Sequence, residues 1–225
     1  MKFQAPRNRT RLTVASLLFA ALLALVAACS SNTPTTTPPT AAAVVQPTKA
    51  AAAAVPAAQR ADMYKALPPM TIDANKKYQA TIQTAKGNIV VDLYPKDAPQ
   101  HVNSFVFLAR QGFYDGLTFH RVVKEPQPFV IQGGDPLGTG TGGPGYNIPP
   151  EISRKHLRGS LAMARTSGPP ETTPSSGSQF YIALTDLPFL DGMYTAFGQT
   201  TPDTISVIDK IEMGDVIKTI TITEQ

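Results

Sequence analysis

The sequence predicts a mainly β domain in which short strands form a closed barrel capped by helices. Most segments after residue 72 alternate apolar and polar residues in short runs, the period of a strand with one buried face. Turns that contain Gly, Pro, Asn or Asp separate these runs. The two stretches with helical spacing lie near the ends of the domain, so strands and helices do not alternate as in a βαβ fold.

The first residues have the pattern of an export signal. A basic N-terminus precedes an uncharged run at 12–28 that is rich in Leu and Ala, short for a membrane span and closed by small residues. Ala27-Ala28-Cys29 resembles a bacterial lipobox, so we expect residues 1–28 to be removed and Cys29, the only cysteine, to be lipidated. An ordinary secretory signal and an uncleaved anchor are the alternatives. The expected location is extracytoplasmic, at the bacterial cell envelope, with the membrane reached through a lipid anchor.

The net charge of +4 belongs to that leader. Four of the 20 Lys and Arg residues lie in it, which leaves 16 basic residues against 16 Asp and Glu. The pI of about 9.2 therefore does not indicate nucleic acid binding, and we expect no nucleic-acid partner.

Residues 29–71 are expected to form a lipidated, disordered tether. The stretch up to Arg60 is rich in Thr, Pro and Ala and lacks aromatic residues, so it cannot bury enough apolar surface to offset chain entropy. Residues 62–70 read as an irregular lead-in. The folded domain is expected at 72–225, long enough for one core.

The domain is expected to start with a hairpin, 77–84 and 88–94, followed by a helix. Asp97 is the expected N-cap, Pro99 stands in the first turn, and Gly112 ends the helix. Apolar runs at 117–123 and 129–132 then carry Arg121 and Gln132. Further strands are predicted at 159–164, 179–184, 195–198 and 216–223, and a second helix at 205–213.

Several chemistries are set aside. The glycine-dense run 138–145 lacks Gly-Lys-Ser/Thr, and the prolines after it forbid a helix, so we interpret it as a structural loop and not a phosphate site. The three His residues show no metal-ligand spacing, and Ser178 lacks a Gly-x-Ser-x-Gly frame. We expect no metal and no cofactor.

What remains is one arginine, two glutamines and apolar surface. Strand alternation puts Val130 with Gln132 on one face and Gln179 with Tyr181 on another. If Arg121 turns towards them, they form an apolar groove with one cation and two amides, suited to an extended peptide. Taken singly, each polar residue also fits a structural role: a snorkelling arginine or an amide at a strand edge.

The motifs together resemble those of the cyclophilin family of peptidyl-prolyl isomerases, in the family's order across about residues 76–223. The matching motifs are Phe119-His120-Arg121, Phe129-Val130-Ile131-Gln132-Gly133-Gly134-Asp135, Gly140-Thr141-Gly142-Gly143, Leu161-Ala162-Met163-Ala164, Gly177-Ser178-Gln179-Phe180, Leu190-Asp191-Gly192 and Phe197-Gly198. The resemblance implies an eight-stranded antiparallel closed β-barrel capped by two α-helices.

The resemblance also implies roles for individual residues, with Arg121 as the catalytic arginine. It implies a substrate groove of Phe129, Val130, Gln132, Ala164, Gln179, Tyr181, Phe189, Leu190 and Tyr194. The chain departs from the family pattern in four places: residues 124–128 lengthen the link between two strands, Phe189 replaces a common Trp, Tyr194 replaces a common His, and Arg165-Thr166 replaces the usual Asn-Ala. The longer link leaves open whether Phe129 is displaced from its place in the groove.

The functional expectation is a monomeric peptidyl-prolyl cis-trans isomerase that acts on proline-containing exported polypeptides. The alternatives are a proline-peptide binding module or holdase chaperone with vestigial catalysis, and a structural envelope protein that only uses the barrel.

Overall fold

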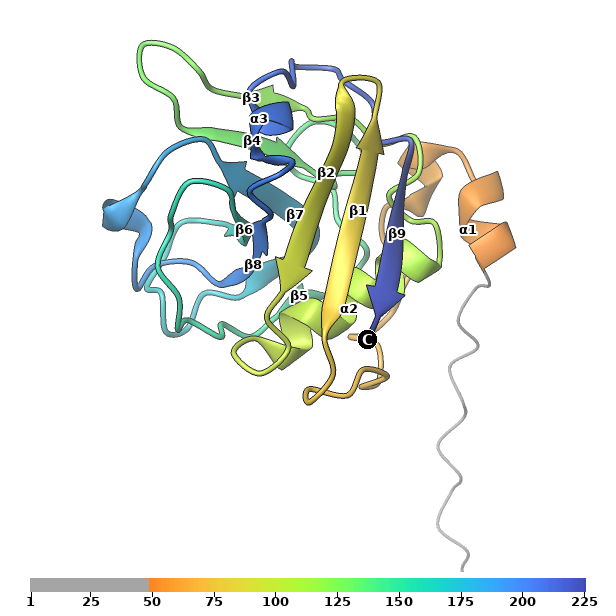
Figure 1. Cartoon of the computed structure of the whole chain (residues 1–225). Helices are drawn as coiled ribbons and strands as arrows, with labels where there is room; N and C mark the ends of the chain where they lie inside the picture. The colour runs from red at the N-terminus through yellow and green to blue at the C-terminus, as the bar shows by residue number, and fades with distance from the viewer. Residues whose placement is uncertain (1–48) are drawn as a thin grey trace, which may run out of the picture. The chain divides into compact units, whose positions relative to one another are not determined.

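The computed structural model describes residues 49–225 (Figure 1). The expected signal, Cys29 and the first part of the tether lie outside the described residues. Within 49–225, none of the helices has the length and apolar character needed to cross a bilayer.

The strands form one antiparallel sheet in the order β3-β4-β7-β6-β8-β2-β1-β9, with β5 beside β7. In chain order the strands are β1 (Tyr78–Thr84), β2 (Gly87–Leu93), β3 (Arg121–Val122), β4 (Val130–Gly133), β5 (Asn147–Ile148), β6 (Ser160–Arg165), β7 (Ser175–Ala183), β8 (Ala196–Thr200) and β9 (Thr219–Glu224). The mainly β prediction is confirmed, and the predicted β1–β2 hairpin is present with Thr84 opposite Gly87.

The prediction of a closed barrel is wrong. The sheet is curled, but its two end strands, β3 and β9, do not pair. Irregular segments at 116–119 and 214–217 cross the space between them. They share one isolated bridge, Thr118 with Val216, and backbone hydrogen bonds such as Phe119 N–H to the Asp215 carbonyl at 2.9 Å. Gly116 and Gly214 adopt φ of +78° and +90°, which interrupts a regular ladder at this place. The predicted strand at 117–123 is consequently regular only at Arg121–Val122.

Helix α2 (Pro99–Arg110) lies where the sequence predicts it and contributes a run of buried residues to the core. The prediction that Asp97 is the N-cap of this helix is wrong. Ala98 occupies the N-cap position without a side-chain bond, and the Glu151 carboxylate accepts hydrogen bonds from Gln100 N–H at 3.0 Å and His101 N–H at 3.1 Å. Asp97 instead pairs with Arg154 at the surface, at 2.6 Å. A carboxylate distant in sequence therefore satisfies the helix start.

The second predicted helix is reduced to one turn, α3 (Ile205–Ile208). The chain turns after it, and Glu212 N–H donates to the Asp215 carboxylate at 2.8 Å. This turn directs the chain back toward residue 216, so the helix cannot continue to residue 213. Other short helices are α1 (Lys49–Ala54), η1 (Ala57–Arg60) and η2 (Pro188–Leu190).

The folded part starts earlier than the predicted residue 72. Arg60 is 5% exposed and donates to the carbonyls of Val55 at 2.9 Å and Phe113 at 3.0 Å. Tyr64 is buried, and the edge of its ring meets the Phe107 ring at a centroid distance of 5.3 Å. The end of the expected tether, from about residue 57, is thus packed against the domain because it carries one aromatic anchor and one arginine that caps carbonyls.

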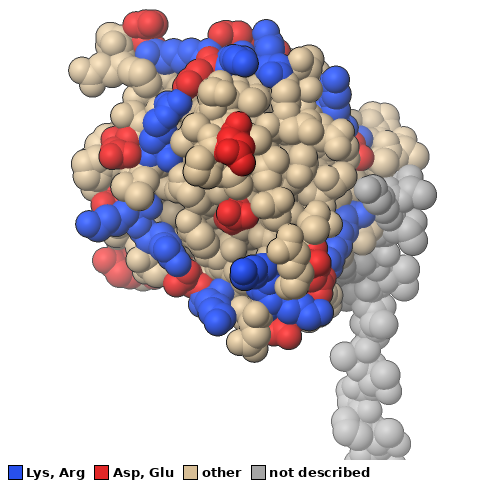
Figure 2. Space-filling view, in the orientation of Figure 1, with Lys and Arg blue, Asp and Glu red and all other residues tan. Residues whose placement is uncertain are grey.

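Buried side chains form two groups. The larger one fills the space between the sheet and α2. The smaller one, here called the groove cluster, consists of Val130, Ala162, Tyr181, Ala183, Leu187, Leu190 and Ala196. On the face drawn in Figure 2, acidic and basic side chains are interspersed and are not gathered by sign.

Candidate active site

Arg121 lies exposed on β3, directly opposite Gln132 of β4. Its Nη1 donates to Gln132 Oε1 at 3.2 Å. Gln132 Nε2 in turn donates to Gln179 Oε1 at 3.0 Å, and Gln179 Nε2 donates to the Gly142 carbonyl at 2.7 Å. This chain of hydrogen bonds fixes the two amides and gives the guanidinium one defined partner. No other residue of the described part of the chain accepts from Arg121, so its other N–H groups are available to a ligand.

Phe129 stands beside the arginine. The Arg121 Cζ atom lies 5.4 Å from the centroid of the Phe129 ring, within the range of a cation–π contact. Phe129 also stacks on Phe189 with a centroid distance of 5.9 Å. Phe189 is 66% exposed, so it forms the outer edge of the site.

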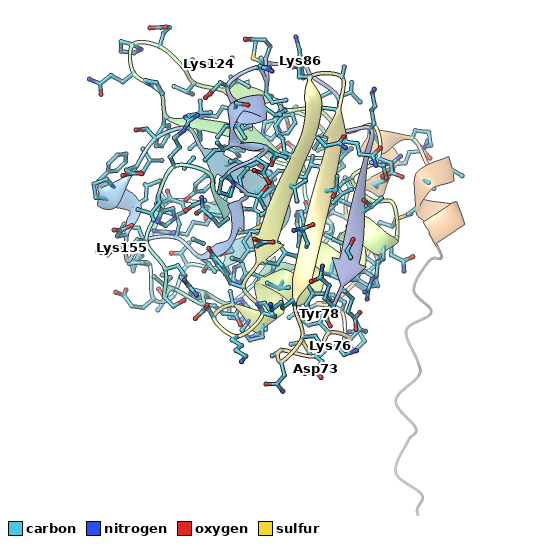
Figure 3. The ribbon with its side chains drawn as sticks, in the orientation of Figure 1. Asp73, Lys76, Tyr78, Lys86, Lys124 and Lys155 are labelled. Atoms are coloured by element: carbon cyan, nitrogen blue, oxygen red, sulfur yellow. The ribbon has the colours of Figure 1, made fainter. Side chains whose placement is uncertain are left out.

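The insertion at 124–128 leaves Phe129 in place. Val123 and Phe129 close the loop with backbone hydrogen bonds, Phe129 N–H to the Val123 carbonyl at 2.9 Å and Val123 N–H to the Val130 carbonyl at 3.0 Å. The loop extends outward from β3 and β4 (Figure 1), and Lys124 on it (Figure 3) pairs with Glu212 at 2.6 Å. The added residues therefore lengthen the loop without entering the groove.

The groove cluster forms the apolar part of the site. Val130, Tyr181 and Leu190 are at most 9% exposed, and Phe129, Ala164 and Tyr194 pack against them. The structure thus brings together the predicted residues of the described chain: Arg121, Phe129, Val130, Gln132, Ala164, Gln179, Tyr181, Phe189, Leu190 and Tyr194. The predicted lipidation site, Cys29, lies outside the described residues.

The structure adds to the site His156, Asp191 and Arg165, which the predicted set of site residues did not include. His156 stacks against Tyr181 at a centroid distance of 6.1 Å, and its backbone N–H donates to the Asp191 carboxylate at 2.7 Å. Arg165 lies with its Cζ 4.8 Å from the Tyr194 ring centroid. Through these contacts His156 packs against Tyr181, and Arg165 packs against Tyr194. No sequence pattern connects them, because they join separate loops.

A cavity of about 550 Å³ adjoins the groove. Gln132, Ala164 and Gln179 belong to both, and the glycine run at 140–143 forms part of the cavity wall. The run is a loop, as predicted, but it also supplies the carbonyl that holds Gln179. That function depends on a side chain distant in sequence, so the glycine spacing alone could not indicate it.

Two histidines near the site have lowered pKa values. Burial is the main cause for His120, whose two ring nitrogens have no hydrogen-bond partner among the described residues. Burial also lowers the pKa of His156, against the opposing effect of Asp191. Among residues 49–225 there is no group of three or more His, Cys, Asp or Glu side chains that could hold a metal ion.

These pKa shifts predict a loss of stability in mild acid. An unfolded histidine takes up a proton near about pH 6.5, whereas the folded His120 and His156 resist protonation until a lower pH. The unfolded state therefore binds more protons in this window, and the free energy of unfolding should fall as the pH drops through about 6.5 and be flat only above about pH 8. Urea unfolding between about pH 5 and 8 measures this effect.

His120→Gln is the matched variant, because it removes one of the two titrating groups and keeps a polar side chain. Its stability should depend less on pH than that of the wild type over the same range. A variant with an unchanged slope would contradict the assignment of the effect to His120.

Comparison with known proteins gives a consistent result. Residues 79–224 match the family model described as cyclophilin type peptidyl-prolyl cis-trans isomerase/CLD. A Helicobacter pylori protein named peptidyl-prolyl cis-trans isomerase is 50% identical over 149 residues, which cover 64% of this chain and 86% of that protein. Peptidyl-prolyl cis-trans isomerase B of Bacillus subtilis is 44% identical over 133 residues, 58% of this chain and 87% of that protein.

Solved structures of cyclophilin-type isomerases have a similar fold. A Cryptosporidium parvum cyclophilin-type isomerase superposes with a TM-score of 0.59 at 30% identity and covers 66% of this chain and 99% of its own. The same parasite protein has been crystallised in the presence of the dipeptide Ala-Pro, with a TM-score of 0.57 at 31% identity over 65% of this chain and 99% of its own.

Proposed function

The chain belongs to the cyclophilin-type peptidyl-prolyl cis-trans isomerase family, and we propose that Arg121 catalyses X-Pro bond rotation in exported proteins. The chain is a peptidyl-prolyl isomerase. One observation carries the proposal: Arg121 is exposed, bonded to Gln132, and beside the apolar groove cluster. The proline ring enters that cluster, and the peptide backbone passes Arg121.

The chemistry follows from the amide bond. Because of resonance, rotation about a peptide bond has a barrier of about 18–20 kcal/mol. At the twisted transition state the prolyl nitrogen loses its conjugation with the carbonyl, and its lone pair becomes localised on the nitrogen. A guanidinium N–H of Arg121 donates a hydrogen bond to that lone pair, which neither planar isomer offers. The interaction is stronger in the transition state than in the ground state, as catalysis requires.

Arg121 does not supply the whole acceleration. An increase in rate of about 10⁵ corresponds to about 7 kcal/mol, whereas one donor aimed at the transition state contributes about 2.7–4 kcal/mol. The apolar walls at Val130, Tyr181 and Leu190 exclude water from the bond and strengthen the remaining interactions. No covalent intermediate is required.

A protease-coupled assay with a proline-containing peptide tests the activity. The protease cleaves only the trans isomer, so an isomerase accelerates the slow phase that otherwise takes about 10–100 s. A binding module or holdase would bind the peptide without changing that phase. A structural protein would do neither.

We further propose that the domain is held at the outer side of a membrane by a lipid on Cys29. The run at 12–28 and Ala27-Ala28-Cys29 support export followed by lipidation, so the domain acts on proteins outside the cytoplasm while a lipid holds it at the membrane. Mass spectrometry of the N-terminal peptide is expected to find an acylated Cys29 and no residue before it. Cys29→Ser should move the protein from the membrane fraction to the soluble fraction without lowering isomerase activity. A wild-type chain that retains residues 1–28, or a Cys29→Ser variant that stays with the membrane, would contradict lipid anchoring.

A further inference from the structure

The cavity beside the groove has one wall that comes from outside the family domain. Asp62 lines it, together with the glycine loop, Gln132 and Gln179. The family match begins only at residue 79, so Asp62 is a feature of the segment before the domain. This segment was expected to be part of the tether.

The backbone around Asp62 is fixed. Its N–H donates to the Gly143 carbonyl at 3.0 Å, and Tyr64 N–H donates to the Pro144 carbonyl at 2.8 Å. A Cβ atom at Gly145 would collide with the Tyr64 carbonyl, so segment and loop are in direct contact. Asp62 has a φ of +55°, and it alone among the described non-glycine residues has a positive φ. The buried Arg60 and Tyr64 on either side hold this uncommon conformation in place.

The Asp62 carboxylate is available to a ligand. It makes no hydrogen bond or ion pair with any other residue in the described part of the chain, and the residue is exposed. The other charged residue of the cavity wall, Arg165, is engaged. It donates to the carbonyls of Met193 at 2.8 Å and Thr166 at 3.1 Å and lies over the Tyr194 ring. The cavity wall thus carries a carboxylate without an ion-pair partner among the described residues, an arginine whose donors are directed at backbone carbonyls, and polar groups that can solvate a long side chain.

The spacing of the strands relates this cavity to the apolar groove. Gln179 lies two residues along β7 from Tyr181, which is about 7 Å on the same face of the sheet. An extended peptide also advances about 7 Å over two residues and returns its side chain to the same face. With the proline beside Tyr181 and the peptide running along β7, a side chain two positions from the proline would reach the cavity.

We propose that Asp62 makes this cavity a subsite for a basic side chain two residues from the substrate proline. The inference rests on the proposed function, because the proline must occupy the groove cluster. A cavity of about 550 Å³ is within the usual range for ligand sites and holds a Lys or Arg side chain. The segment that leads to the expected membrane tether thereby takes part in substrate choice.

The test compares peptides that differ only at the second position before or after the proline, with Lys, norleucine or Glu at that place. Both kcat/KM for isomerisation and the Kd of a fluorescent version are measured. The wild type should prefer Lys over norleucine by about two- to fivefold at one of the two positions, the effect expected of a partly exposed ion pair. The preference should shrink in high salt, because salt screens exposed charges.

Asp62→Asn should remove the preference for Lys and leave the norleucine peptide unchanged. Asn tolerates a positive φ, so the backbone is retained. Asp203→Asn is the matched control: it removes one exposed carboxylate outside the cavity and should keep the preference. A Lys preference that survives in Asp62→Asn, or its absence in the wild type, overturns the inference. If the wild type binds peptides but does not isomerise them, the proposed function fails while the Kd values still decide the role of Asp62.

Discussion

Arg121→Ala is expected to lower kcat/KM for X-Pro isomerisation by about 100- to 1,000-fold, the usual effect of removing one donor aimed at the transition state. The residue is exposed, and its bond to Gln132 is 3.2 Å long, so its loss should change the free energy of unfolding by less than about 0.5 kcal/mol. Activity and stability therefore separate at this position. The protease-coupled assay and a urea titration of the same sample measure the two quantities.

Two further variants sharpen this prediction. Arg121→Lys keeps a charge but loses the planar fork of donors, so it should recover only a small part of the lost rate. Arg110→Ala removes another exposed arginine, which pairs with Glu224 at 2.9 Å at the surface of the domain, and should keep wild-type activity. If Arg121→Ala and wild type give equal rates, Arg121 is not the catalytic group. If neither exceeds the uncatalysed rate, the holdase alternative is favoured.

Glu151→Ala is expected to lower the free energy of unfolding by about 3 kcal/mol, because it leaves several donors unpaired at a cost of about 1–3 kcal/mol each. The Glu151 carboxylate accepts from Gln100 N–H, His101 N–H and, at 2.7 Å, from His101 Nδ1, and the His101 side chain is fully buried. Alanine leaves these groups unpaired at the start of α2. Equilibrium unfolding in urea measures the change.

Asp97→Ala is the matched control, because Asp97 is the carboxylate that local sequence rules would choose as the cap. Its partner is Arg154 in an exposed pair, so we expect a loss of less than about 1 kcal/mol. Glu151→Gln retains an acceptor oxygen and should fall between the two. A larger loss for Asp97→Ala than for Glu151→Ala would contradict the capping role seen in the structure.

The sequence predicted what depends on neighbouring residues. Alternation over 77–94 identified the β1–β2 hairpin, and helical spacing after Pro99 identified α2. The site was predicted through motifs that each lie within one segment, and the structure places those segments side by side. Arg121 meets Gln132 because β3 and β4 are adjacent, and Gln132 meets Gln179 because β4 and β7 are adjacent.

What the sequence did not show depends on contacts between distant segments. The Glu151 cap, the Gly142 carbonyl that holds Gln179, and the packing of Arg60 each join residues far apart in the chain. The composition of the expected tether predicted disorder up to residue 71, but Tyr64 is buried and packs against Phe107. Closure of the β-barrel likewise depends on whether β3 and β9 pair, and these strands are distant in the sequence. The local pattern at 117–123 could not reveal the break at Gly116 and Gly214.

The pairing of β1 with β9 has a consequence for the order of folding. Tyr78 lies opposite Glu224, so the first strand of the sheet needs the last one as its outer neighbour. This contact closes a loop that spans nearly the whole domain, and such long-range contacts slow folding. Until residues 219–224 have been synthesised, β1 keeps an edge of unpaired N–H and C=O groups. A nascent chain therefore cannot complete its sheet until synthesis of the domain is almost finished.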